Sequence, residues 1–153
     1  MTLNISERTP MKTFLLALTT ALGLSSVAQA EDTPNLVTIL ASGEPQTQLM
    51  SMVLTMQSMQ QGSNAHILLC GPAGDLALKE APASATAPQA PRDMSPQRLM
   101  QNIMQSGATV EVCAIYLPNK GVEPTALLDG ITAAAPPEMA ARMLAPNTRI
   151  MSF

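Results

Sequence analysis

Aromatic side chains are scarce in this chain of 153 residues, which has one Tyr, two Phe and no Trp. Met is abundant instead, with 12 residues. Charge is sparse as well: the chain has no basic cluster and its formal net charge is −3. These features argue against nucleic acid as a partner, because nucleic-acid-binding domains carry concentrated positive charge.

Several common kinds of active site are excluded by residues that are missing. The one histidine, His66, is expected near the start of a strand, away from the edge where a catalytic triad would form. No CxxC or CxxH spacing is present, so we expect no metal site. The sequence GPAG at 71–74 lacks the pattern of a phosphate-binding loop and is interpreted as a turn, and we expect no cofactor.

The first 30 residues have the pattern of a secretory signal peptide. A short positive segment begins at Met11, where we expect translation to start, and an uncharged apolar run occupies 14–27. Ala28 and Ala30 form the small-x-small motif, which predicts cleavage after Ala30. We therefore expect an exported, periplasmic protein with no stable membrane insertion after cleavage; an uncleaved anchor is the alternative. The remaining 123 residues, 31–153, suit a single domain, with six basic and ten acidic residues.

Hydrophobic periodicity predicts alternating strands and helices in that domain. Buried strands are expected at 35–42 and 65–70, further strands at 109–117, 130–134 and 148–153, and helices at 45–61, 96–105, 123–129 and 136–144. The order predicts an α/β fold: a three-layer α/β/α domain with a five-stranded, mainly parallel sheet. Residues 81–93, rich in Pro and Ala, are expected to form a flexible loop within it.

The methionines recur at helical spacing, for example at Met52, Met56 and Met59. Soft thioethers suit copper(I), but the same spacing is typical of side chains that pack a helix against a sheet. We interpret them as core residues.

Functional residues of a parallel sheet lie at the carboxyl ends of its strands. Three segments are expected at that edge: 42–45, 70–75 and 113–121. Both cysteines, Cys70 and Cys113, fall there, and Lys120 is close to Cys113 in the sequence. If the second and third strands are neighbours, a disulfide between the cysteines is feasible; if the first strand lies between them, a bridge would need movement of the strands.

The sequence resembles the DsrE/DsrF-like sulfur-relay family, which has the YchN-like fold. The resemblance covers about residues 35–153 and rests on the order of the elements, on SGATVEVCAIYL around Cys113, on Lys120 and Gly121 after it, and on GPAGDLAL at 71–78. The resemblance implies that Cys113 accepts sulfane sulfur as a persulfide and passes it to a partner protein. It assigns Lys120 and Gly121 only a position in the supporting loop. It also implies a homo-oligomer and a protein sulfur donor or acceptor.

Two other functions stay open at this point. The chain is either a non-catalytic periplasmic binding or assembly module of the same fold, or a thiol–disulfide redox protein that uses Cys70 and Cys113 as a pair. Cysteine reactivity separates these functions, because only a functional thiol must be accessible and ionisable.

Overall fold

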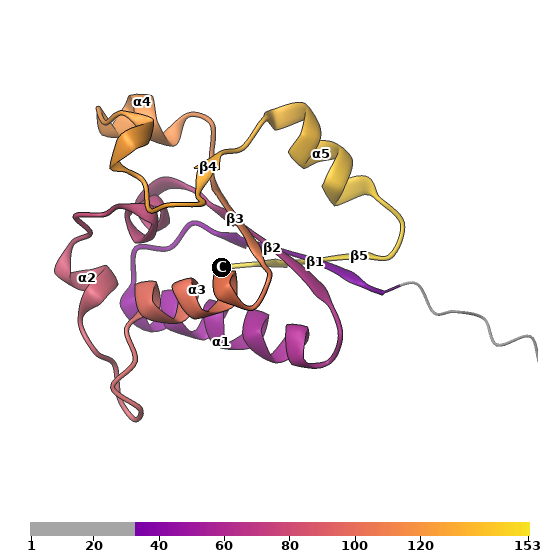
Figure 1. Cartoon of the computed structure of the whole chain (residues 1–153), viewed down its shortest axis with the longest axis horizontal. Coiled ribbons are helices and arrows are strands. Elements are labelled where there is room, and N and C mark those ends of the chain that lie inside the picture. The colour runs from indigo at the N-terminus through magenta and orange to yellow at the C-terminus, as the bar shows by residue number, and fades with distance from the viewer. Residues whose placement is uncertain (1–32) are drawn as a thin grey trace, which may run out of the picture. The chain divides into compact units, whose positions relative to one another are not determined.

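The computed structural model describes residues 33–153, which form a five-stranded sheet flanked by helices (Figure 1). The strands are β1 (Asn35–Leu40), β2 (Asn64–Leu69), β3 (Thr109–Val112), β4 (Thr132–Ala133) and β5 (Thr148–Ser152). Their order in the sheet is β4-β3-β2-β1-β5, and every pair is parallel. The predicted α/β class is confirmed, with a sheet that is parallel throughout. The predicted signal peptide lies outside the described residues.

Helices connect the strands and cover the two faces of the sheet unequally. The α-helices are α1 (Pro45–Gln60), α2 (Ala83–Thr86), α3 (Pro96–Gln105), α4 (Tyr116–Lys120) and α5 (Pro136–Leu144); Gly71–Ala77 and Pro124–Ala126 are 3-10 helices. Figure 1 shows α1 and α3 on one side of the sheet and α5 on the other. Within residues 33–153, no helix combines the length and the hydropathy that crossing a bilayer requires.

Capping residues define where the two longest helices begin. Glu44 precedes α1, and its Oε2 accepts a hydrogen bond of 2.8 Å from the backbone N–H of Thr47. Ser95 precedes α3, with Pro96 at the first helical position. The Ser95 hydroxyl accepts a hydrogen bond of 3.3 Å from the backbone N–H of Arg98.

Two hydrophobic clusters lie on opposite faces of the sheet. The larger cluster joins strand residues such as Leu40 and Ile67 to α1 and α3 through Met52 and Met100. Both methionines are fully buried, so the core interpretation is confirmed for them. The smaller cluster contains Val37, Leu68, Ala134 and Met139, the last of which lies on α5.

The sequence prediction is wrong about the segment after the third strand. The pattern predicts a strand from 109 to 117, but β3 ends at Val112, and α4 begins at Tyr116. Apolar residues continue past Val112 because Tyr116 and Leu117 pack into the core from a helix, which a short apolar run cannot distinguish from a strand. Residues 123–129 likewise contain only the 3-10 helix Pro124–Ala126, where the pattern predicts a longer helix.

The segment at 81–93 has structure of its own. It contains α2, whose Ala85 is buried, and an isolated antiparallel bridge joins Gln89 to Met94 at its end. The segment is thus packed against the domain at Ala85 rather than being only a linker, and its flexibility stays a prediction.

Candidate functional site

The two cysteines meet at the carboxyl edge of the sheet. The strands β2 and β3 are adjacent, and their last paired residues are Leu69 and Val112. The next residue after each of these is a cysteine, so the two cysteines lie side by side. Cys70 and Cys113 form a disulfide, with 5.1 Å between their Cα atoms. Of the two arrangements that the sequence allows, the structure has the one in which the second and third strands are neighbours. Both cysteines are half-buried and pack against the smaller cluster.

The segments after the two cysteines are joined by one carboxylate. Asp75 lies on the 3-10 helix after Cys70, and Tyr116 and Lys120 lie on α4 after Cys113. The Tyr116 hydroxyl donates to Asp75 Oδ1 at 2.7 Å, and Lys120 Nζ lies 2.7 Å from the same oxygen. Burial, and then the hydrogen bond to Asp75 and its negative charge, raises the pKa of Tyr116 well above its usual range. Tyr116 therefore stays protonated and acts as a donor.

A pocket of about 450 Å³ lies between these two segments. Gly71, Pro72 and Asp75 form one wall, and Ile115, Asn119 and Lys120 are on the other. Each wall begins within two residues of a cysteine, so the disulfide ties the walls together where they leave the sheet. Ile115 is 70% exposed and presents an apolar side chain at this edge.

Gly74 permits the close packing of Tyr116. A Cβ atom at Gly74 would overlap the Tyr116 ring. We therefore expect Gly74→Ala to lower the free energy of unfolding by about 1–3 kcal/mol, the usual cost of overpacking. Urea unfolding measures it, with Tyr116→Ala as the matched background, where the same change should cost much less. An equal cost in both backgrounds would show that the tight fit is not the cause.

Sequence patterns did not reveal the contacts that hold this site together. The resemblance gave Lys120 only a loop position, and the structure pairs it with Asp75. Gly121 ends α4 with φ +72°, a conformation suited to glycine. Asp75 lies in a segment predicted for this edge, and Tyr116 is the only tyrosine, but no spacing rule links residues 41 positions apart.

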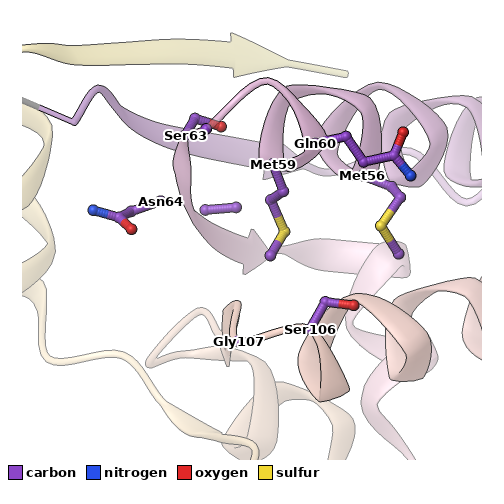
Figure 2. A pocket seen from close by; sticks show the side chains of 9 residues that line it. Met56, Met59, Gln60, Ser63, Asn64, Ser106 and Gly107 are labelled. Carbon is purple, nitrogen blue, oxygen red and sulfur yellow. The ribbon is translucent and has the colours of Figure 1, made fainter.

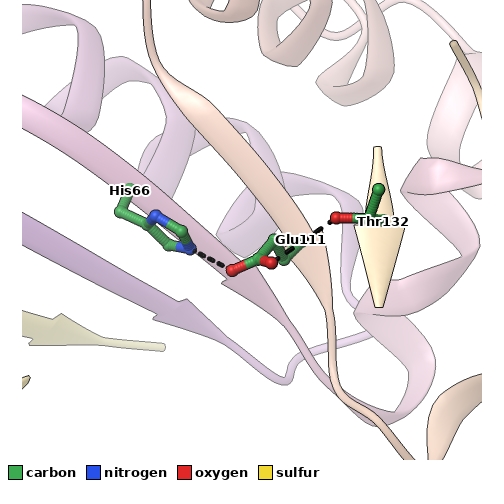
Figure 3. Close-up of polar contacts among 3 residues, drawn as sticks. All are labelled: His66, Glu111 and Thr132. Carbon is green, nitrogen blue, oxygen red and sulfur yellow. Dashed lines mark hydrogen bonds and ion pairs between the residues drawn. The ribbon is translucent and has the colours of Figure 1, made fainter. Parts of the chain in front are cut away.

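A buried histidine and a half-buried glutamate form a polar pair farther from this edge, in the middle of the sheet. His66 on β2 is 4% exposed, and its Nε2 lies 2.7 Å from Oε2 of Glu111 on β3; the other oxygen of Glu111 lies 3.5 Å from the hydroxyl of Thr132 (Figure 3). The sequence predicts His66 as a strand residue away from the catalytic edge but does not identify its partner. No short-range signal could find it, because Glu111 comes from another strand.

The buried histidine makes stability depend on pH. Burial, and next the positive charge of Arg142 on α5, lower the pKa of His66, while Glu111 acts in the opposite direction. The unfolded chain therefore binds a proton at a higher pH than the folded chain, near the ordinary value of about 6.5. We expect the free energy of unfolding to be highest above that pH and to fall as the pH drops through it. Urea unfolding between about pH 7.5 and 5 measures this, and His66→Gln should show a shallower decline; identical slopes would contradict the assignment.

A second pocket, of about 520 Å³, lies at the opposite end of the strands. It is lined by the start of β2, including Asn64, and by Met56 and Met59, whose thioethers point toward it in Figure 2. Its lining contains no cysteine and no ionisable side chain. Among residues 33–153, no group of three or more His, Cys, Asp or Glu side chains is placed to hold a metal ion. The cysteine edge is therefore the candidate functional site.

Comparison with solved structures identifies the fold. The crystal structure of the ychN protein from E. coli matches with a TM-score of 0.63 at 16% sequence identity, covering 80% of this chain and 100% of that chain. The protein of unknown function MTH1491 from Methanobacterium thermoautotrophicum matches with a TM-score of 0.56 at 9% identity, with the same coverage. No family model and no curated protein matches the sequence. The chain thus has the YchN-like fold.

Proposed function

We propose that this chain is a sulfur-relay protein of the DsrE/DsrF-like family, in which Cys113 carries sulfane sulfur to a partner protein and Cys70 resolves it. The observation that carries the proposal is the pairing of Cys70 with Cys113 at the carboxyl edge of adjacent parallel strands. This edge is where open α/β sheets place their sites. The choice of Cys113 as the carrier follows from the family resemblance.

The disulfide supplies the oxidation that loading requires. Sulfide carries two more electrons than sulfane sulfur, so an oxidant must accept them. Hydrosulfide attacks the Cys113 sulfur, a bond forms between the two sulfur atoms, and the bond between Cys113 and Cys70 breaks. The products are a persulfide on Cys113 and a thiolate on Cys70, and the electron pair of the broken bond stays on Cys70.

The persulfide on Cys113 then reacts in one of two ways, both by thiol–disulfide exchange. A thiolate of the acceptor protein attacks the outer sulfur of the persulfide, and Cys113 leaves as a thiolate. If no acceptor is present, the Cys70 thiolate attacks the inner sulfur, releases hydrosulfide and restores the disulfide. Cys70 thereby limits how long the persulfide survives.

The surroundings of the disulfide support access by a partner. The pocket between the two segments opens this edge, and the exposed Ile115 offers an apolar contact beside it. Lys120 is already paired with Asp75, so its role here is to hold α4 against the 3-10 helix rather than to act as a free cation. Export to an oxidising compartment is part of the proposal, since disulfides persist there.

The disulfide between Cys70 and Cys113 also supports a second candidate function. A thiol–disulfide redox protein would exchange electrons through Cys70 and Cys113 without carrying sulfur. The intact mass of the protein, purified without reductant and then incubated with sulfide, separates the two functions. We expect a starting mass two hydrogens below the fully reduced mass, and after incubation a mass one sulfur atom above the fully reduced mass. Reduction of the disulfide without any added sulfur would support the redox function alone. An unchanged mass would contradict both the relay and the redox function.

A further inference from the structure

We infer that β5 is the interface of a homodimer in which two copies of this chain pair their β5 edges antiparallel and join two sheets into one. The inference does not depend on the chemistry of the cysteines. It rests on three features of β5: outward backbone groups of Ile150 and Ser152 that have no backbone partner among residues 33–153, thin cover on both faces, and a sequence that matches itself in the antiparallel direction.

The backbone hydrogen bonds show which groups of β5 face outward. Asn147 C=O accepts from Asn35, and Phe153 donates to Ile39 and accepts from Ala41, all within 3.0 Å. Successive residues of a strand direct their backbone groups to opposite sides, so Arg149 and Met151 also face β1. The even-numbered residues Thr148, Ile150 and Ser152 therefore face the open edge.

The outward groups are largely free to pair with another strand. Thr148 N–H already bonds to Ala145 O at 3.3 Å. Thr148 C=O accepts only a long, exposed contact of 3.4 Å from the side chain of Arg149. Both backbone groups of Ile150 and of Ser152 have no partner within the described chain. These groups can form a ladder with a second strand.

The two faces of β5 are more exposed to solvent than the faces of strands in parallel sheets usually are. Parallel sheets are usually buried on both faces, and Val37 on the neighbouring β1 is fully buried. Its partner in the register, Ile150, is 51% exposed, and Leu144 at the end of α5 is 85% exposed. Arg149, on the other face, is exposed as well. A second strand beside β5 would cover part of the Ile150 side chain through cross-strand contacts on the same face.

The strand sequence TRIMS fits a second copy of itself. In an antiparallel register centred on Ile150, this residue exchanges both backbone bonds with Ile150 of the second copy. Ser152 N–H then meets the C=O of Thr148 in the copy, which exchanges its weak contact with Arg149 for a backbone bond. Arg149 lies opposite Met151 of the copy, so the two Arg149 side chains are not paired with each other.

The geometry also limits the assembly to two chains along this direction. Each chain has a single β5 edge, and the two-fold arrangement uses it completely. The opposite edge of the sheet is β4, which has only two residues and cannot support comparable pairing.

Two measurements test the inference on the full chain. Sedimentation velocity should show a concentration-dependent dimer, and hydrogen exchange should show slow, concentration-dependent exchange at the amides of Ile150 and Ser152. Ile150→Pro removes an outward N–H but none of the hydrogen bonds to β1. We expect it to weaken dimerisation at least about tenfold through loss of central hydrogen bonds, while circular dichroism shows an intact fold.

Met50→Lys is the matched control, because Met50 is 53% exposed but lies on α1. It should leave the dimer unchanged. A monomer at all concentrations overturns the inference. So does a dimer in which the Ile150 and Ser152 amides exchange rapidly, since that dimer uses another surface. If Ile150→Pro fails to fold, the exchange measurement on the unaltered chain still decides the question.

Discussion

Cys113→Ser is expected to abolish sulfur loading, whereas Cys70→Ser is expected to load sulfur and keep it. The variants are matched, because each replaces one half of the same disulfide with a hydroxyl residue of similar size. Without Cys113 there is no thiol at the carrier position to hold the persulfide. Without Cys70 the persulfide forms on Cys113 from polysulfide, and no neighbouring thiol can expel it.

The expected gain in persulfide lifetime in Cys70→Ser follows from the closeness of the Cys70 thiol to Cys113 in the unaltered protein. In the unaltered protein the resolving thiol lies at the end of the adjacent strand, so its attack is intramolecular and has a large effective concentration. We expect Cys70→Ser to lengthen the lifetime of the persulfide by about a hundredfold or more under the same conditions.

Alkylation followed by measurement of the intact mass determines both the extent of sulfur loading and the lifetime of the persulfide. Each reduced variant is incubated with polysulfide, passed through a desalting column and alkylated after increasing times. Comparable loading of Cys113→Ser would show that Cys70 can act as the carrier and would contradict the assigned roles. Equal persulfide lifetimes in Cys70→Ser and in the unaltered protein would remove the resolving role of Cys70.

The architecture could be predicted from the sequence because its signals are local. The strands at β1 and β2 are short apolar runs bounded by Gly or turn residues, and α3 has a Ser-Pro start and a glycine after its end. The order of elements then restricts the topology, since parallel strands need crossover connections. The position of both cysteines at the carboxyl edge follows from the same reasoning.

The interior of the site could not be predicted, because it depends on which strands are neighbours. The disulfide forms only because β1 lies on the far side of β2 from β3, a choice that residue patterns leave open. The bonds of Asp75 to Tyr116 and of His66 to Glu111 depend on the same long-range placement. The helix α4 could not be predicted because it has only five residues, with Pro118 in the middle. So short a segment does not show helical periodicity.

Reduction of the disulfide is expected to lower the free energy of unfolding by about 4 kcal/mol. The bond closes a loop between residues separated by 43 positions. Cross-linking a loop of this length removes conformational entropy from the unfolded chain, and the chain-entropy relation gives about 4 kcal/mol at 25 °C. The reduced protein still has both clusters of the core, so we expect it to stay folded but less stable.

Urea unfolding of the oxidised protein, the reduced protein and the double variant Cys70→Ala, Cys113→Ala measures this effect. The reduced protein and the double variant should be destabilised alike, and adding reductant to the double variant should change nothing. The proposed relay depends on the same quantity, because folding favours the disulfide over the two thiols by the free energy that the bond contributes to stability. A contribution of about 4 kcal/mol disfavours opening of the bond by about a thousandfold, so loading requires excess hydrosulfide. If reduction leaves the stability unchanged, the cysteines are not joined in the native protein, and loading with sulfide has no internal oxidant.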